Sequence, residues 1–529
     1  MSMTSGERFS IEDIALFERP VPFRMPFRFG AATLDHAPQA FVRVGIRMAG
    51  GDVVEHGASA EMMMPKWFDK NPSLSNEDNV DQLRRSLLFA REAYLSDRAP
   101  ASAFAHHARH YHPLLALNAR SGNEGLVAGY GPALIDRAVI DAVCRAMGLS
   151  FFAAMRRNVF GFRTLTLLPD EFAGFDDDAF VASLHAHESV DARHTVGLAD
   201  AIDELIDDAG DKAFPDANKD ANKHGNHGAN EDGAARPFDD GLPWTLANVI
   251  RTYGHRWFKI KLGGDIDADV RRLRSIAAVL RRLSPDCRIT LDGNEQFRDI
   301  AHVEAAWSAF RGDPALREML LRVEWIEQPI ARSRALSAPV TAHGSPPLMI
   351  DESDGDLDSF PSALALGYRG VSSKSCKGLY KSLINLARVR RWNASHPGDP
   401  AFISGEDLTM QAGIAVQQDL ALVSLLGIDH VERNGHHYVD GMQGAPAHEQ
   451  RSFVHAHPDL YTSSDGHARL AIRNGSLSLR SLDCVGFACA AEIDWDAMTP
   501  MPDVSSNAAY SASSAAAATI TPATALHPH

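Results

Sequence analysis

The sequence has few cysteines and no long apolar stretch. Five of its 529 residues are cysteine. The number is odd and no CxxC pair occurs, so neither a disulfide framework nor a cysteine zinc site is expected. No apolar run approaches the roughly 18 residues that cross a bilayer. The polar start, MSMTSGERFS, lacks the apolar core of a signal peptide. These absences predict a cytoplasmic protein without a membrane partner.

An excess of basic residues is also absent. The chain has 68 acidic against 52 basic residues and a formal net charge of −16. Nucleic acids and anionic membranes attract basic surfaces, so neither is expected as the main ligand. Hydrophobic residues make up 45% of the chain, which is enough for a sizeable core. The length suits a large domain with a smaller one beside it.

The middle of the chain alternates between strand-like and helix-like segments. Between the second and third of these strands, for example, apolar residues recur at helical spacing from Val270 to Leu283. Eight strands alternating with helices predict an α/β protein built on a parallel (β/α)₈ barrel. The eight predicted strands are RHTVGL from Arg193, RWFKIKL from Arg256, RITLDGN from Arg288, VEWIEQP from Val323, PLMIDES from Pro347, GVSSKS from Gly370, AFISGED from Ala401 and DHVERN from Asp429.

Both ends of the chain predict a second, α+β domain. Residues from about Phe9 to Lys70 are β-rich, with a hairpin turn at Gly50-Gly51-Asp52, and the segment from Ile472 to Asp496 is β-like again. We expect an N-terminal domain over 1–130, the barrel over 131–445 and a returning segment over 446–502. Residues 207–240 and 503–529 have too few large apolar side chains to offset the entropy of ordering and are predicted to be disordered.

Two lysines occupy one face of a predicted barrel strand. In RWFKIKL, Phe258 and Ile260 share the face that packs on helices, so Lys259 and Lys261 point into the barrel. They lie near the carboxyl end of the strand, where barrel active sites are built. A lone KxK more often marks surface lysines at a strand end, so the next strands decide.

The three following strands each end in an inward carboxylate, namely Asp292, Glu327 and Asp351. Such acids commonly cap loops or helices, but three at one level beside a lysine pair point to a cation. Oxygen ligands without His or Cys favour Mg²⁺, with Mn²⁺ as the alternative. The competing interpretation is a barrel core in which these acids form salt bridges with lysines.

The sixth strand brings Lys374 to the matching level, across the barrel from Lys261. A hydrogen next to a carboxylate is very weakly acidic, and its removal leaves an enediolate that Mg²⁺ stabilises. The base has to be neutral, and a nearby cation and a second lysine are expected to lower its pKa. Lys377 lies past the strand end and is interpreted as a solvent-facing lysine rather than the base.

The ordered motifs KIK, LDGN, WIEQP, IDES and SSKSCKG resemble those of the enolase superfamily, of the muconate-lactonizing-enzyme and mandelate-racemase type. The resemblance spans roughly Phe9 to Asp496. It implies a modified TIM barrel with a capping domain, and an isomerase or lyase that acts by Mg²⁺-dependent abstraction of the proton alpha to a carboxylate. It further implies a small-molecule carboxylate substrate and homo-oligomers as an assembly typical of such barrels.

The resemblance also implies residue roles. Mg²⁺ would be held by Asp292, Glu327 and Asp351, with Lys261 and Lys374 as the acid/base pair and Lys259 assisting the enolate. Further residues are expected in the second shell or in contact with substrate: Asn294, Glu352, Glu406, Asp407, Glu432, Asn434, Arg24 and Arg28. The alternative for Glu406 or Asp407 is a helix cap, and for the two arginines a plain surface role. Met62, Met63, Met64 and Trp67 suggest a partly apolar wall.

The reaction itself stays open between racemisation, epimerisation, cycloisomerisation and β-elimination. The seventh strand has no histidine, which argues against the mandelate-racemase arrangement of bases, and the eighth lacks the Asp-x-Asp of dipeptide epimerases. The alternatives are an acid-sugar-type dehydratase of the same superfamily and a non-catalytic metal-binding barrel. A metal-dependent hydrolase would need histidines at strand ends, for which His430 is the only candidate.

Overall fold

The computed structural model describes residues 6–30, 32–203, 240–340 and 344–504. The insertion predicted over 207–240 lies outside the described residues except for Asp240. The predicted tail over 503–529 lies outside them except for Asp503 and Val504.

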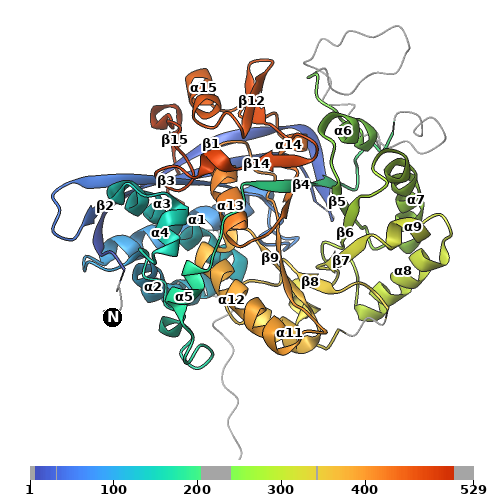
Figure 1. Cartoon of the computed structure of the whole chain (residues 1–529), viewed down its shortest axis with the longest axis horizontal. Helices are drawn as coiled ribbons and strands as arrows, with labels where there is room; N and C mark the ends of the chain where they lie inside the picture. Colours follow the sequence, from blue (N-terminus) through green and yellow to red (C-terminus); the bar gives the residue numbers. More distant parts are fainter. Residues whose placement is uncertain (1–5, 31, 204–239, 341–343, 505–529) are drawn as a thin grey trace, which may run out of the picture.

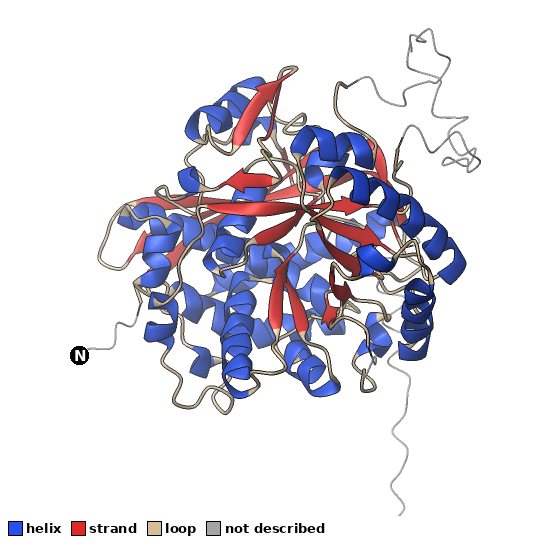
Figure 2. Ribbon diagram, turned by 45° about the vertical axis from the view of Figure 1, so that its right-hand side comes forward, coloured by secondary structure: helices blue, strands red, loops and turns tan. Residues whose placement is uncertain are grey.

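Eight parallel strands form a closed barrel at the centre of the molecule (Figures 1 and 2). Each strand pairs with the next, and the eighth pairs with the first through Val431 and Ala192. All eight predicted strands are therefore confirmed. They are β4 (Ser189–Val196), β5 (Trp257–Lys261), β6 (Arg288–Asp292), β7 (Val323–Glu327), β8 (Leu348–Ile350), β9 (Gly370–Ser373), β10 (Phe402–Gly405) and β11 (His430–Arg433).

Helices surround the barrel strands, as Figure 2 shows. In α7 (Ile266–Leu283) the Asp265 side chain caps the first turn, and Leu273 and Ile276 are buried against the sheet. The other barrel helices are α6 (Leu246–Tyr253), α8 (Ile300–Gly312), α9 (Arg317–Leu320), α10 (Arg332–Ala335), α11 (Ser359–Leu366), η4 (Ser375–Lys377), α12 (Leu379–Ser395), α13 (Ile414–Leu425) and α14 (Gly435–Tyr438).

A long antiparallel hairpin dominates the second domain. Strands β1 (Phe9–Phe29) and β2 (Ala32–Met48) pair over most of their length, and β3 (Val54–Met62) follows the predicted turn, where Gly50 has a φ of 82°. The last strand, β15 (Thr499–Pro500), pairs with β1, so the C-terminal segment returns to the N-terminal sheet. The capping domain predicted from both chain ends is thus confirmed as part of the fold.

Helices α1 (Asn76–Ser96) and α3 (Gly125–Met147) pack on this sheet, and α2 (Ala103–Arg120) packs on both of them. A Cβ at Gly131 would lie 2.2 Å from the Ser86 carbonyl oxygen, so only glycine allows α1 and α3 to approach so closely. The remaining elements are α4 (Phe151–Arg156), η1 (Thr164–Thr166), α5 (Asp177–Ala182), α15 (Ala447–Ala456), β12 (Tyr461–Ser464), β13 (His467–Leu470), β14 (Ser476–Ser478), η5 (Arg480–Leu482) and η6 (Trp495–Ala497).

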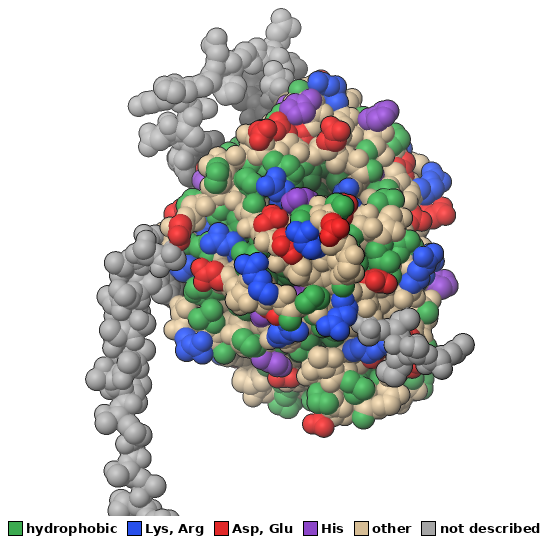
Figure 3. Space-filling model, turned by 90° about the vertical axis from the view of Figure 1, so that its left-hand side faces the viewer, with side chains coloured by type: hydrophobic (Ala, Val, Ile, Leu, Met, Phe, Trp, Pro, Cys, Tyr) green, Lys and Arg blue, Asp and Glu red, His purple; other side chains and the backbone are tan. Residues whose placement is uncertain are grey.

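Aromatic side chains close the barrel at the amino-terminal ends of its strands. Trp257 and Trp325 pack with Met349, and the His430 ring stacks on Trp257 with centroids 3.7 Å apart. His430 is therefore remote from the carboxyl ends of the strands, which removes the candidate for a metal-dependent hydrolase. On the face seen in Figure 3, acidic and basic side chains are interspersed. Across the described residues, every helix is too short or too polar to cross a membrane.

Candidate active site

The two lysines of β5 point into the barrel, as the alternation of the strand predicts. Phe258 and Ile260 are buried among the surrounding helices, while Lys259 and Lys261 are buried on the inner face. The ammonium of Lys259 is shared among acids of four different strands. Its Nζ lies 3.1 Å from Asp292, 2.8 Å from Glu327, 2.7 Å from Glu406 and 3.0 Å from Glu432.

Each of the three predicted metal ligands is paired with a lysine. Asp292 accepts a hydrogen bond from Lys261 Nζ at 2.6 Å, and Glu327 accepts one from Lys259 at 2.9 Å. On the other side of the barrel, Asp351 accepts one from Lys374 at 2.8 Å. Lys261, at the end of β5, and Lys374, after β9, lie four strands apart in the ring of eight and so face each other.

The three carboxylates are held by ammonium groups in this structure. Oxyanions on neighbouring strands repel one another, and the ammonium of Lys259 lies between Asp292 and Glu327. Among the residues that the structure describes, only a group of three histidines has ligand atoms within 4.8 Å of one another. The lysine contacts are those of the competing salt-bridge interpretation, and the assignment of the three acids as metal ligands stays a prediction.

The chemistry of the donor set nevertheless fits a hard divalent cation. All three side chains offer carboxylate oxygens from adjacent strands. Glu327 Oε2 is buried and makes no hydrogen bond, although Lys259 Nζ lies 2.8 Å away. Burial raises the pKa of Glu327 well above its usual value, and the neighbouring charges of Asp292 and Glu406 raise it further, against Lys259. The lysine therefore does not fully balance the acids around it.

The pKa of Lys374 is raised in this structure. Burial alone would lower it, but the charges of Asp351, Glu432 and Glu327 outweigh burial. Correspondingly, although burial raises the pKa of Asp351, the ammonium groups of Lys374 and Lys377 hold it below its usual value. Lys374 and Asp351 thus form an ionised pair here, and the lowering of the lysine pKa expected beside a divalent cation stays a prediction.

Lys377 is buried, which corrects its interpretation as a solvent-facing residue. Its Nζ donates to Ser372 Oγ at 2.7 Å, lies 2.7 Å from Asp354 and 3.7 Å from Asp351. The chain turns back through η4 directly after β9, and this turn carries Lys377 inward beside Lys374. Lys377 thus supports the carboxylate that Lys374 contacts.

Asn294 and Glu352 contact each other next to the predicted ligands. Asn294 Nδ2 donates to Glu352 Oε1 at 3.1 Å, and the Asn294 backbone N–H donates to Asp292 at 2.8 Å. Lys70, from the capping domain, reaches Glu352 at 3.2 Å. The backbone here is strained, because the non-glycine residues Asn294, Glu295 and Gln328 have φ values of 39°, 70° and 30°. Sequence patterns gave no sign of Lys70.

The acids of the last two strands complete the inner charge network. Glu406 pairs with Arg193 and Lys259, and Glu432 accepts from Thr195 Oγ1 at 2.5 Å. Arg193 and Thr195 alternate on β4 as the lysines do on β5, so the period of the strand could have identified them. Glu406 is buried and its carboxylate contacts Arg193 and Lys259, so it is not used as a helix cap.

The Asp407 carboxylate binds backbone N–H groups of the loop that follows β11, and it does not contact Lys259. It accepts N–H groups of Asn434 and Gly435 at 2.9 and 3.2 Å, and it pairs with Arg433 at 3.1 Å. It thereby fixes the start of α14. The capping alternative named the following helix, α13, whereas these contacts are to α14, and Asp407 also borders the cleft over the lysines.

A small cleft opens over the lysines at the carboxyl ends of the barrel strands. Lys259, Lys261 and Lys374 reach it from the barrel, and Asn434 borders it. The opposite wall is apolar, as the Met and Trp residues near position 64 predict. It consists of Phe27, Phe29, Met64, Trp67 and Leu408. Lys374 Nζ lies 4.0 Å from the centre of the Trp67 ring, a cation–π contact.

The two arginines expected near the substrate are differently placed. The Arg24 guanidinium pairs with Asp240 at 2.5 Å and donates to the His437 carbonyl oxygen at 2.8 Å. Arg28 is exposed and alternates with Phe27 and Phe29, which line the cleft, so it points away from it. Arg24 therefore anchors structure, and the geometry gives neither arginine a place on the substrate.

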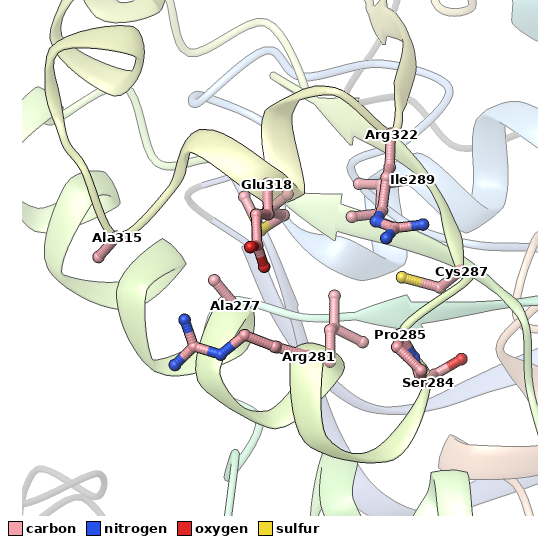
Figure 4. Close-up of a pocket in the computed structure, with 11 residues that line it drawn as sticks. Ala277, Arg281, Ser284, Pro285, Cys287, Ile289, Ala315, Glu318 and Arg322 are labelled. Atoms are coloured by element: carbon pink, nitrogen blue, oxygen red, sulfur yellow. The ribbon is translucent and has the colours of Figure 1, made fainter.

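A second hollow lies at the other end of the barrel (Figure 4). It is bordered by Arg281 of α7, Glu318 of α9, Cys287 and Arg322. Cys287 and Arg322 directly precede β6 and β7, so this hollow is at the amino-terminal face, where barrel residues serve stability rather than catalysis.

Comparison with known proteins agrees with this architecture. Residues 245–377 match the family model described as enolase C-terminal domain-like. An enolase from Streptomyces coelicolor has a similar fold, with 15% identity, a TM-score of 0.56 and coverage of 92% of this chain and 95% of that one. No curated protein sequence matches the chain.

Two further structures were solved with ligands. Muconate lactonizing enzyme from Pseudomonas fluorescens, complexed with muconolactone, is 16% identical with a TM-score of 0.54, covering 92% of this chain and 98% of that one. An enolase from Bradyrhizobium, complexed with magnesium and mandelic acid, is 14% identical with a TM-score of 0.54, covering 94% and 98%.

The family match over the barrel and the shared fold confirm the resemblance seen in the motifs. Over residues 245–377 the sequence matches the enolase family model, and the fold is that of enolase-superfamily structures of the muconate-lactonizing and mandelate-racemase type.

Proposed function

We propose that the protein abstracts the proton alpha to a substrate carboxylate and so forms an enediolate, with Lys261 and Lys374 as the acid/base pair. One observation carries the proposal. The two lysines face the same cleft from β5 and β9, on opposite sides of the barrel, and each is hydrogen-bonded to a carboxylate at a strand end. Bases on two faces of one carbon are what inversion requires.

Asp292, Glu327 and Asp351 are the residues that would hold Mg²⁺. When bound there, Mg²⁺ would balance the charge of these acids and stabilise the negative charge that develops on the substrate carboxylate. The all-oxygen donor set on adjacent strands supports this assignment.

The acid that each lysine contacts determines whether that lysine donates or accepts a proton. A lysine paired with an ionised acid keeps its proton, so Lys374 donates as long as Asp351 faces it uncompensated. It becomes a base once the charge of Asp351 is balanced in another way. On the other side of the cleft, Lys261 donates a hydrogen bond to Asp292. The protein thus holds one proton on each side of the cleft, ready for return to the substrate carbon.

Lys259 serves a different role because it is bound by acids on four sides. Even though burial lowers it, the surrounding carboxylates hold the pKa of Lys259 well above its usual value. A permanent ammonium at this depth can stabilise the negative charge of an enediolate but cannot take up a proton. Asn294 and Glu352 would keep Asp292 oriented from behind.

The apolar wall bears on the substrate class. Phe27, Phe29, Met64 and Trp67 come from the N-terminal part of the chain, which supports 1–130 with 446–502 as a capping domain over the barrel of 131–445. A carboxylate with an apolar or unsaturated body would cover these side chains, whereas a polyhydroxylated acid sugar would leave its hydroxyl groups unpaired there. We therefore favour racemisation, epimerisation or cycloisomerisation over dehydration of acid sugars.

Proton exchange tests the proposal directly. Purified protein with Mg²⁺ in D₂O is incubated with α-substituted carboxylates and N-acyl amino acids, and deuterium at the α-carbon is followed by NMR. Exchange is expected with at least one compound that has an apolar body. Lys261→Met and Lys374→Met should each slow that exchange by about 10²–10⁴-fold, and chelation should abolish it.

Lys381→Met is the matched control. Lys381 is also a buried lysine beside an aspartate, Asp354, but it does not border the cleft. This variant should retain exchange. If exchange survives in both Lys261→Met and Lys374→Met, or if a folded protein binds no Mg²⁺, the proposal is wrong.

A further inference from the structure

Three histidines gather on the outer side of the barrel, away from the lysines. His194 is on β4, His255 directly precedes β5 after α6, and His436 lies in α14. One ring nitrogen from each lies within 4.8 Å of the other two. Their ring centroids are 5.1 to 5.4 Å apart. No other group of three His, Cys, Asp or Glu side chains in the described part of the chain converges in this way.

These imidazoles have nitrogen atoms without hydrogen-bond partners among the described residues. The unpaired atoms are His194 Nδ1, His255 Nε2 and both ring nitrogens of His436. His255 Nδ1 contacts the Ala192 carbonyl oxygen at 2.8 Å, which fixes its tautomer with Nε2 as the free lone pair. A buried nitrogen without a partner costs free energy, roughly 1–3 kcal/mol per group. A ligand that accepts several lone pairs at once removes this cost.

The cluster is neutral, as metal ligands have to be. Burial lowers the pKa of His194 and His436 well below the usual value, and that of His255 to about 4. The nearest cations are already paired. Arg24 pairs with Asp240, and Arg433 with Asp407 and Asp419. His437, packed on His194, lies 3.9 Å from Asp200.

We propose that His194, His255 and His436 form a second metal site, which binds one divalent transition-metal ion of the zinc class. Imidazole nitrogens suit Zn²⁺, Co²⁺ and Ni²⁺, whereas the carboxylates at the barrel mouth suit Mg²⁺. Tetrahedral zinc with bonds of 2.0–2.1 Å needs ligand nitrogens about 3.4 Å apart. The nitrogens lie within 4.8 Å of one another, so binding requires each pair to approach by up to about 1.4 Å.

The fourth coordination position would face a small cleft. His436 borders this cleft together with Tyr253, Met410, Arg469 and Leu470. A three-histidine site with an open position can take water or an external ligand, as sites of that composition do in zinc enzymes. We assign no reaction to it.

The two sites lie on opposite faces of the same strand. On β4, Arg193 and Thr195 point inward to Glu406 and Glu432, and His194 points outward between them. The inference does not depend on the proposed function. The two sites are nevertheless close along the chain. His436 lies in α14, and Asn434, the residue directly before that helix, borders the cleft over the lysines.

Cobalt provides the test, because Co²⁺ absorbs visible light strongly in four-coordinate nitrogen sites and weakly in octahedral oxygen sites. Metal-free full-length protein is titrated with Co²⁺ and then with Zn²⁺. We expect one equivalent of the strongly absorbing form, displaced by Zn²⁺ and not by Mg²⁺. His255→Gln and His436→Gln should weaken Co²⁺ binding by more than about 100-fold, since even loss of an outer-shell partner costs 10–100-fold.

Control variants distinguish metal binding at the three histidines from binding at the barrel carboxylates and from loss of folding. Asp292→Asn with Glu327→Gln should leave the cobalt spectrum unchanged, and so should His430→Gln, which alters a buried histidine elsewhere. His436→Cys should restore binding with a new thiolate-to-cobalt charge-transfer band. The inference is overturned if no strongly absorbing form appears, if the mouth variants abolish it, or if folded His436→Cys binds Co²⁺ without that band.

Discussion

The inner and outer faces of β4 and β5 solve the burial of polar side chains in opposite ways. Inside, Lys259 is enclosed by acids and Arg193 pairs with Glu406, so each charge has an opposite charge beside it. Outside, His194, His255 and His436 are uncharged and leave lone pairs without partners. The inner face is thus built from paired charges, and the outer one from neutral groups.

This difference teaches how the two faces respond to change. Removing one member of the inner network leaves its partners as uncompensated buried charges, which strongly destabilises the folded state. A neutral imidazole can be replaced by an apolar side chain of similar size with little loss. The inner face should therefore be sensitive to substitution and the outer face tolerant, until a metal ion occupies it.

Replacement of Lys259 should have the largest effect. Lys259→Met leaves four carboxylates with one cation fewer, and we expect the free energy of unfolding to fall by about 3–5 kcal/mol. Urea denaturation of the metal-free protein measures it. Lys381→Met should cost less, because Asp354 keeps Lys377 as a partner. Equal losses in the two variants would refute the shared-cation description.

Glu61 is an intermediate case, a buried acid whose partner Arg137 lies 3.2 Å away. Burial raises its pKa to about 7, against the charge of Arg137. The folded state then holds a proton that the unfolded state releases near pH 4.5. Stability conferred by the protonated form is full below pH 4.5 and declines as the pH rises to 7, by up to about 3 kcal/mol.

Glu61→Gln isolates this contribution, because glutamine keeps the shape and cannot ionise. Unfolding free energies of the variant and the parent are compared between pH 5 and pH 8. The difference should change in favour of the variant as the pH rises to 7 and level off above it. A difference independent of pH would show that Glu61 titrates as it does in the unfolded chain.

Replacement of His194 should have the smallest effect. In metal-free protein, His194→Leu removes an imidazole with an unpaired nitrogen, and we expect a cost below about 1.5 kcal/mol. Adding Zn²⁺ at 100 times its dissociation constant should widen the gap to the parent by about 2.7 kcal/mol, because only the parent binds it. A large cost without metal, unchanged by Zn²⁺, would contradict the contrast between the two faces.

The fold could be predicted closely from the sequence because its signals are local. Each barrel strand is short and carries its own alternation, so Phe258 and Ile260 already specify that Lys259 and Lys261 face inward. The long hairpin of β1 and β2 was predicted only in part, because Pro20, Pro22, Pro26 and Pro38 interrupt the usual pattern of a strand. Helix α2, with its four histidines, was not predicted.

The alternation of side chains along a strand is the only signal in the sequence from which the site could be predicted. Period places Lys261, Asp292, Glu327 and Asp351 at strand ends, but it does not tell which acid a lysine will contact or how far apart the acids lie. Arg24 and Lys377 were misjudged because their surroundings come from distant segments, Asp240 and Asp354. The histidine group was missed since its members belong to three separate elements without a shared motif.

The left-handed backbone at Asn294, Glu295 and Gln328 has a consequence for engineering this enzyme. Each such residue costs of the order of 1–3 kcal/mol and persists only where neighbours enforce it. Glycine at these positions would relieve the backbone but remove buried side-chain contacts, such as those of Gln328 with Ser353 and of Glu295 with Arg332. Backbone strain and side-chain contacts are thus opposed at this rim, and a search for hardier variants should begin elsewhere in the molecule.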